Sequence, residues 1–313
     1  MKTRSKILPG LAVLLVLLIA LPPLVFNAEK LTLDDEARSR LPGRFVKLGA
    51  GTVHYELAGP EDAETVVLIH GFSVPYYLWD PTFDALVREG MRALRYDLFG
   101  RGYSDRPEAD YTLDFFVSQL SELLDALGVD GPVNLVGLSM GGPIAAAYAN
   151  RHPGRVRSLC LIGPQGEPAN GRSIFPLNVP LLGEYIMSAY MAPFLLPKSQ
   201  AGDFYRPERF PGWEARYREQ MKYRGFRRAI LSTLRHTAVI DAIPGYAAVG
   251  KGGLPVLLLW GKEDTTMKAV NIAKVREALP AVSFHPIDEA GHMPHYERPE
   301  TVNPILIAFL KNP

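Results

Sequence analysis

The feature that most constrains this sequence is the motif Gly-Leu-Ser-Met-Gly at 137–141, which joins an apolar run to a stretch of small residues. A serine hydroxyl is a weak nucleophile unless neighbouring groups activate it. A sharp strand-to-helix turn would present Ser139 above a sheet edge, and the flanking glycines leave room for neighbouring backbone. The N-terminus of the following helix adds N–H groups and a dipole that favour negative charge. The pattern therefore predicts that Ser139 is a catalytic nucleophile.

Two later strands supply a candidate acid and a candidate base. The apolar run 255–261 predicts a buried parallel strand and is followed by Asp264. A predicted helix then leads to a short strand, 282–287, after which comes His292. Because parallel strands joined by a helix end at the same sheet edge, Asp264 and His292 are expected beside Ser139. This arrangement predicts His292 as the general base and Asp264 as the residue that orients it.

Neighbouring residues compete for both roles. His295 lies three residues after His292 and is an alternative base, and Glu263 directly precedes Asp264 and is an alternative acid. A carboxylate that follows a strand is often only a solvated loop charge. The assignment of Asp264 therefore depends on its two predicted partners.

Two backbone amides are candidates for binding the oxyanion of an acyl-transfer reaction. With a turn of this kind, one donor is the amide that follows the nucleophile, here Met140. The other donor comes from the loop after the third strand. The run 65–70 is rich in strand-forming residues and ends in a His-Gly turn, so the amide of Phe72 is the candidate. The side chain of His70 is expected to be structural.

From about Phe45 to the C-terminus, the chain resembles the serine hydrolases of the α/β-hydrolase fold. The matching segments, in the order found in that family, are 70–71, 96–105, 137–142, 260–264 and 291–292. The resemblance implies an α/β fold with a mostly parallel eight-stranded sheet, helices on both faces and a helical cap insertion. It also implies a structural role for Asp97 in the loop after the fourth strand. The implied activity is hydrolysis of carboxylic esters through a Ser-His-Asp triad and an acyl-enzyme, as in esterases and lipases, without cofactor or metal.

Related activities differ in how well the sequence fits them. Haloalkane dehalogenases and epoxide hydrolases carry an aspartate where this chain has Ser139. Carbon–carbon hydrolases of meta-cleavage products share the triad and stay open as an alternative, although their oxyanion loop tends to be glycine-rich and this chain has Phe72 there. A further alternative is that the chain is a non-enzymatic member of this fold that serves in binding. Such relatives usually lose a triad member, and all three predicted members are present here.

Composition is consistent with one catalytic domain that carries an insertion. The 313 residues are 47% hydrophobic, enough for a large core, and a net charge of +1 gives no indication of a nucleic-acid partner. The single cysteine, Cys160, excludes an intramolecular disulfide. Nothing in the sequence indicates an oligomeric state. The predicted parts are an N-terminal anchor or signal peptide (1–30), the first part of the core (45–164), a helical cap (165–253) and the second part of the core (254–313).

The predicted cap suggests what kind of group the site binds. It interrupts the alternation of strands and helices beside the edge that carries the predicted triad, and it is too long for an ordinary loop. Apolar side chains gather in the segment 181–194, which contains Met187 and Tyr190. These two are tentative substrate-binding residues, and a hydrophobic acyl group is the expected occupant.

The N-terminus predicts a membrane segment. Residues 7–26 are twenty residues without a charge, which as a helix span roughly 30 Å, about one hydrocarbon core. The exit sequence fits a signal-peptidase site poorly, so an uncleaved single-pass anchor is favoured over a signal peptide. Basic residues before the run favour an extracytoplasmic catalytic domain, although basic residues after it weaken this bias. An anchored hydrolase with an apolar cap would act on membrane lipids such as monoacylglycerols or on other long-chain esters.

Overall fold

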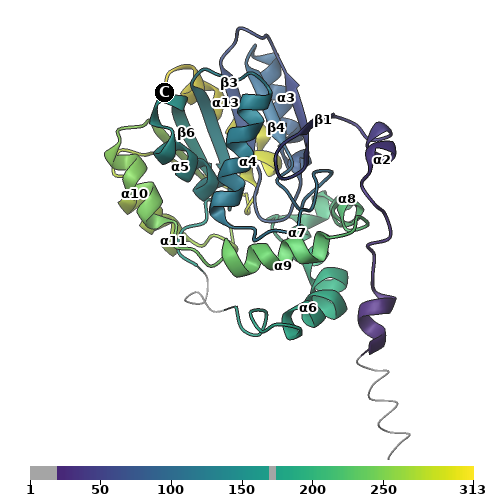
Figure 1. Cartoon of the computed structure of the whole chain (residues 1–313). Helices are drawn as coiled ribbons and strands as arrows, with labels where there is room; N and C mark the ends of the chain where they lie inside the picture. Colours follow the sequence, from purple (N-terminus) through teal and green to yellow (C-terminus); the bar gives the residue numbers. More distant parts are fainter. Residues whose placement is uncertain (1–19, 169–173) are drawn as a thin grey trace, which may run out of the picture.

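One eight-stranded sheet organises the chain in a computed structural model that describes residues 20–168 and 174–313 (Figure 1). The strands are β1 (Arg44–Lys47), β2 (Thr52–Ala58), β3 (Thr65–Ile69), β4 (Arg92–Tyr96), β5 (Val133–Leu138), β6 (Val156–Ile162), β7 (Val256–Gly261) and β8 (Ser283–Ile287). Their order is β1-β2-β4-β3-β5-β6-β7-β8. Strand β2 is antiparallel to both of its neighbours, and the remaining pairs are parallel. The predicted α/β fold with a mostly parallel eight-stranded sheet is confirmed.

Helices cover both faces of the sheet, because successive strand residues point to opposite sides. In β3, Val67 and Ile69 join one hydrophobic cluster, whereas Val66 and Leu68 join the other. The first face is covered by α4 (Leu113–Ala126), α5 (Gly141–Arg151), α10 (Ile243–Lys251) and α11 (Ala269–Ala278). The second is covered by α3 (Asp80–Arg88) and α13 (Pro299–Lys311), with the short α12 (Pro294–Glu297) beside them. Both faces of the central strands β3, β5 and β7 are therefore buried, which explains their largely apolar sequences, whereas the edge strand β8 is mostly accessible.

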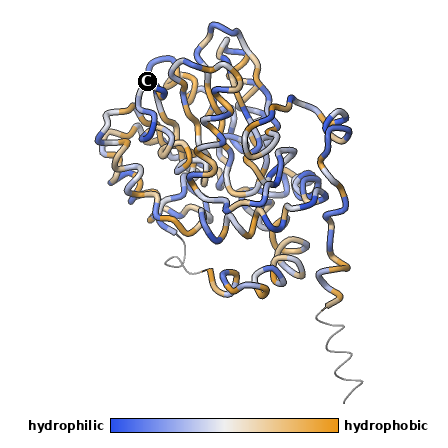
Figure 2. Tube along the Cα trace, viewed as in Figure 1, coloured by the Kyte–Doolittle hydropathy of each residue, from blue (hydrophilic) through white to orange (hydrophobic). Residues whose placement is uncertain are grey.

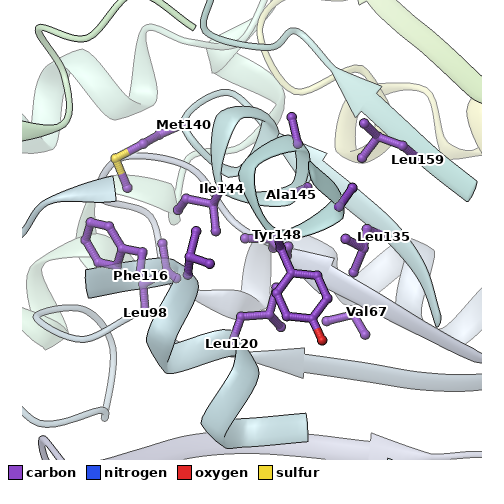
Figure 3. Packing of buried hydrophobic residues seen from close by; sticks show 14 of the residues in the cluster. Val67, Leu98, Phe116, Leu120, Leu135, Met140, Ile144, Ala145, Tyr148 and Leu159 are labelled. Atoms are coloured by element: carbon purple, nitrogen blue, oxygen red, sulfur yellow. The ribbon is translucent and has the colours of Figure 1, made fainter. Parts of the chain in front are cut away.

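Helix α5 packs tightly between the sheet and α4 (Figure 3). Its residues Ile144 and Tyr148 are fully buried in the same cluster as Phe116 and Leu120 of α4. Burial of each large side chain contributes about 1.5–3 kcal/mol. Helix α4 begins at a defined position because the Thr112 hydroxyl accepts a hydrogen bond from the Phe115 amide. The turn that precedes α5 is thus followed by a helix that is closely packed against its neighbours.

The chain between β6 and β7 forms a series of helices. They are α6 (Leu182–Ile186), the π-helical η4 (Met187–Leu195), α7 (Leu196–Ala201), the 3₁₀ turn η5 (Pro207–Arg209), α8 (Trp213–Gln220), α9 (Phe226–His236) and α10. We call α6 to α9, with the segments that join them, the cap. These helices lie together below the sheet in the view of Figure 1, whereas α10 packs beside α5 and α11. The sequence predicts one helix over 213–228 and another over 229–240, but the structure places the break earlier, between α8 and α9. Gly225, with a φ of +92°, separates them.

The residues before β1 attach to the cap. The Glu29 carboxylate accepts hydrogen bonds from the amides of Gly225 (3.2 Å) and Arg227 (2.7 Å) at the start of α9. Leu31 adds a bridge, in which its amide donates to the Lys222 carbonyl at 2.9 Å. We call residues 27–31 the N-terminal strap. Further along, α2 (Asp35–Ser39) returns the chain to the core, where the Arg38 guanidinium pairs with the Asp105 carboxylate.

The structure contradicts the predicted membrane anchor. Within residues 20–168 and 174–313, no helix is both long and apolar enough to cross a bilayer. Residues 20–25 are helical and apolar (Figure 2), but the helix ends there and the polar strap follows at once. The prediction of a single-pass anchor, and of a membrane localisation with an extracytoplasmic domain, is therefore wrong for the described chain. Residues 7–19 of the predicted span lie outside the described residues.

Candidate active site

Ser139 occupies a sharp turn between β5 and α5. Its φ is +52°, a left-handed conformation that is rare for a residue with a side chain. Its amide donates to the Ile162 carbonyl at 3.0 Å, which ties the turn to β6. A Cβ at Gly137 would lie 2.4 Å from the Gly141 carbonyl oxygen, and one at Gly141 would lie 2.2 Å from the Ile69 carbonyl oxygen. The predicted glycine requirement of the motif therefore has a steric cause.

Replacing Gly141 should destabilise the protein. The methyl group of Gly141→Ala meets backbone that cannot move aside, so we expect a loss of about 3 kcal/mol in unfolding free energy. Gly154→Ala is the matched control, because nothing lies within 4 Å of the added Cβ there, and its effect should stay within about 1 kcal/mol. Urea unfolding of both variants measures the difference. Equal stabilities would contradict the steric explanation.

Asp264 and His292 are hydrogen-bonded, as the strand order predicts. The Nδ1 atom of His292 lies 2.8 Å from Oδ2 of Asp264, and both side chains are buried. The other carboxylate oxygen accepts the amides of Thr266 and Met267, each at 2.8 Å. Gly163 packs against the pair, since a Cβ there would lie 3.3 Å from Nδ1 of His292. With Nδ1–H directed to the carboxylate, Nε2 is the nitrogen that remains to accept a proton.

The alternative acid and base have other surroundings. His295 is fully buried, with its ring centroid 4.4 Å from that of Trp79, and burial lowers its pKa to about 3. It is not among the described residues that line the cavity at Ser139. The Glu263 carboxylate accepts the Ala290 amide at 3.0 Å, which holds the loop before His292. Neither His295 nor Glu263 therefore has the contacts that would let it take the role of His292 or Asp264.

The two predicted oxyanion donors belong to the residue after Ser139 and to a loop that lines the same cavity. Met140 directly precedes α5, and Phe72 follows the turn after β3. That turn is close to the nucleophile, because a Cβ at Gly71 would lie 3.6 Å from Oγ of Ser139. The Phe72 peptide is oriented by Arg101, whose Nε donates to the Phe72 carbonyl at 2.8 Å. The role of the two amides as an oxyanion hole stays a prediction.

Ser139 and His292 line one cavity of about 210 Å³. Its apolar lining comes from Phe72, Val74, Leu78, Leu138 and Met293, and its polar lining includes Ser199, Gln200, Asp203 and Thr266. Met187 instead lines a separate groove of about 760 Å³ with Arg235 and other charged residues, and Tyr190 is exposed. Neither is among the described residues around the Ser139 cavity. Their role in substrate binding stays a prediction.

The charges around His292 determine its protonation. Burial alone lowers the pKa of this imidazole, but the charge and hydrogen bond of Asp264, together with the charges of Asp203 and Glu297, raise the pKa to about 9. Burial raises the pKa of Glu297 to about 7 against several backbone amides that lower it. The site thus stabilises an imidazolium, the form that His292 takes after accepting a proton.

This pKa predicts the pH dependence of catalysis. Only the neutral form of His292 accepts a proton, so kcat/KM for an ester should rise with pH and level off above about 9. The measurement is the pH profile of kcat/KM with a neutral ester between pH 6 and pH 10, corrected for spontaneous hydrolysis. An ascending limb near the ordinary histidine value of about 6.5 would contradict the electrostatic account.

Sequence reasoning missed three residues that surround the Asp264–His292 pair. Thr266 donates its amide to Asp264, Glu297 accepts the Gly291 amide at 2.7 Å, and Asp203 accepts the His292 amide at 2.8 Å. The position of Thr266, two residues after the predicted acid Asp264, is a sequence signal that could have identified it as a neighbour of the pair. Asp203 and Glu297 carry no motif, because their positions depend on how the insertion and α12 fold.

Comparisons with known proteins agree with this architecture. Residues 64–299 match the model of a family described as alpha/beta hydrolase fold. A relative in Bacillus subtilis (strain 168), AB hydrolase superfamily protein YfhM, is 28% identical over 86% of this chain and 98% of its own length. Lipase 3 of Moraxella sp. (strain TA144) is 26% identical over 87% of this chain and 86% of its own length. The solved enol-lactonase from Burkholderia xenovorans LB400 superposes with a TM-score of 0.74 at 22% identity, covering 86% of this chain and 100% of that one.

Proposed function

Because the chain belongs to the α/β-hydrolase fold family, we propose that it is a serine hydrolase that cleaves carboxylic esters with apolar acyl groups. The observation that carries the proposal is the buried hydrogen bond of 2.8 Å between His292 and Asp264, on the same cavity as Ser139. A base oriented by a buried acid, next to a serine on a strained turn, is the arrangement that activates a hydroxyl for acyl transfer.

In the proposed reaction, Oγ of Ser139 attacks the ester carbonyl while Nε2 of His292 takes its proton. The carbonyl oxygen becomes an oxyanion that accepts hydrogen bonds from the amides of Phe72 and Met140. His292 then gives the proton to the departing alcohol, which leaves an acyl group on Ser139. Water, deprotonated by His292, attacks this ester and releases the acid. Asp264 keeps Nδ1 protonated and stabilises the imidazolium in both halves.

The size of the cavity guides the choice of acyl group. The expectation of monoacylglycerol substrates depended on the predicted anchor, which the described chain does not contain. The cavity of about 210 Å³ is smaller than the pockets of about 300–1,000 Å³ that hold drug-sized ligands. Its apolar wall favours an alkyl chain. We therefore propose short acyl groups, from acetyl to hexanoyl.

Two assays test the proposed function. A fluorophosphonate probe should label the wild-type protein at a single serine, because the reagent reacts only with an activated hydroxyl. A series of 4-nitrophenyl esters from acetate to palmitate should then give the highest kcat/KM at hexanoate or shorter. Absence of labelling would overturn the serine-hydrolase proposal. Labelling combined with turnover of a vinylogous diketone, but not of esters, would favour the carbon–carbon hydrolase alternative.

A further inference from the structure

The cap places one carboxylate at the Ser139 cavity. Asp203 lies two residues after the end of α7, and it is the one acidic residue among the described residues that line this cavity. It comes from a part of the chain about sixty residues away from both Asp264 and Ser139 in sequence. It nevertheless contacts the loops that carry Asp264 and His292. Asp203 thus connects the cap to the proposed catalytic residues.

The first connection uses the backbone of Asp203. Its carbonyl oxygen accepts the His292 amide at 2.8 Å. The approach depends on Gly291, because a Cβ at that position would lie 2.4 Å from the Asp203 carbonyl oxygen. The peptide that precedes the His292 side chain is therefore held by the cap and not only by its own loop.

The second connection uses the carboxylate. Oδ1 of Asp203 accepts the Thr266 hydroxyl at 2.7 Å. The amide of the same threonine donates to Oδ1 of Asp264 at 2.8 Å, and Oδ2 of Asp264 binds His292. Thr266 therefore links Asp203, through its hydroxyl, to Asp264, through its backbone amide, and Asp264 in turn binds the imidazole.

The segment that carries Asp203 is itself firmly anchored. Phe204 is buried, with its ring centroid 4.1 Å from that of Phe210 and 4.8 Å from that of Trp213. The Glu297 carboxylate joins this segment to the histidine loop, since it accepts the amides of Tyr205 and Gly291, each at 2.7 Å. The position of Asp203 is therefore fixed by packing on one side and by hydrogen bonds on the other.

We propose that Asp203 is a positioning residue for His292, which fixes the base and its orienting acid from the cap and stabilises the protonated imidazole by its charge. The proposal rests on the proposed function. Three acidic groups act on the His292 pKa, namely Asp264, Asp203 and Glu297, and all three raise it; burial lowers it. Burial also raises the pKa of Asp203 itself. Of these groups, Asp203 alone is supplied by the cap.

The test follows the rate of fluorophosphonate labelling of Ser139 as a function of pH, which requires no knowledge of the natural substrate. Asp203→Asn keeps an oxygen that can accept the Thr266 hydroxyl but removes the charge. The ascending limb of the profile should move to lower pH by about half a unit to one unit. At pH 7, below the limb, the variant should label about three- to tenfold faster than wild type. A loss of structure alone would slow labelling at every pH.

Thr266→Val provides an independent variant if Asp203→Asn folds poorly. It removes the hydroxyl that binds Asp203 and retains the backbone amide that binds Asp264. We expect the plateau rate above the limb to fall about three- to tenfold and to be restored by Thr266→Ser. Glu208→Gln is the matched control, because Glu208 is an exposed carboxylate in the same part of the insertion, and it should leave both limb and plateau unchanged.

The outcomes separate this proposal from the function on which it rests. If wild-type Ser139 is not labelled, the proposed function fails. If Ser139 is labelled but the limb of Asp203→Asn coincides with those of wild type and Glu208→Gln, the positioning role is overturned. A plateau of Thr266→Val equal to that of wild type would overturn the side-chain connection in the same way.

Discussion

Ser139→Ala is expected to remove ester hydrolysis by about 10⁴-fold or more and to abolish fluorophosphonate labelling. The loss is large because the other two hydroxyls that line the cavity, those of Ser199 and Thr266, donate hydrogen bonds to the Leu196 carbonyl and the Asp203 carboxylate. Alanine retains the volume that the turn needs. Initial rates with the best short ester, measured beside urea unfolding, give activity and stability separately. The variant should unfold within about 1 kcal/mol of wild type.

The matched control for this change is Ser118→Ala. Ser118 lies on the exposed side of α4, away from the cavity, so the rate should equal that of wild type. If Ser139→Ala retains more than a few per cent of wild-type turnover, another residue is the nucleophile. The strained turn would then need a different explanation.

His292→Ala is expected to lose as much activity as Ser139→Ala, because the base and the nucleophile act as one unit. The double variant should be hardly worse than either single one. Asp264→Asn should be about tenfold to a hundredfold less severe, because a correctly placed imidazole persists in part without its orienting charge. Steady-state rates of the three single variants and of the Ser139→Ala, His292→Ala double variant provide the comparison.

His295→Gln separates the two neighbouring histidines. His295 is buried against Trp79, so the substitution is expected to lower stability while kcat stays within a few-fold of wild type. A dead His295→Gln variant beside an active His292→Ala variant would reverse the assignment of the base.

The sequence contained most of the information needed for the fold. Apolar runs of strand length predict the parallel strands, and the rule that parallel strands end at one edge correctly places Asp264 next to His292. The family match and the sheet order confirm this part. The catalytic roles of these residues stay predictions.

Two features of the structure could not be predicted from the sequence: the end of the N-terminal helix and the contacts of Asp203. The charge-free run before the strap has the composition of a membrane span, but composition does not determine where a helix ends; its described part ends after residue 25. The contact of Asp203 with Thr266 and His292 joins positions far apart in the chain. Such a contact depends on how α7 and the segment after it pack, which no local pattern encodes.

The N-terminal strap has a mechanical consequence. An insertion that is joined to a core only by its two chain ends can rotate about them. Here Asp203 already binds the cap to Thr266 and His292 of the core. The strap adds a further connection, since Glu29 and Leu31 hold the segment around Gly225, and Arg38 of α2, which follows the strap, pairs with Asp105 of the core. These connections hold the cap at several separate points, which opposes its rotation as one body. We therefore expect substrates to enter by local rearrangement of side chains at the cavity mouth, with the cap helices staying in place during turnover.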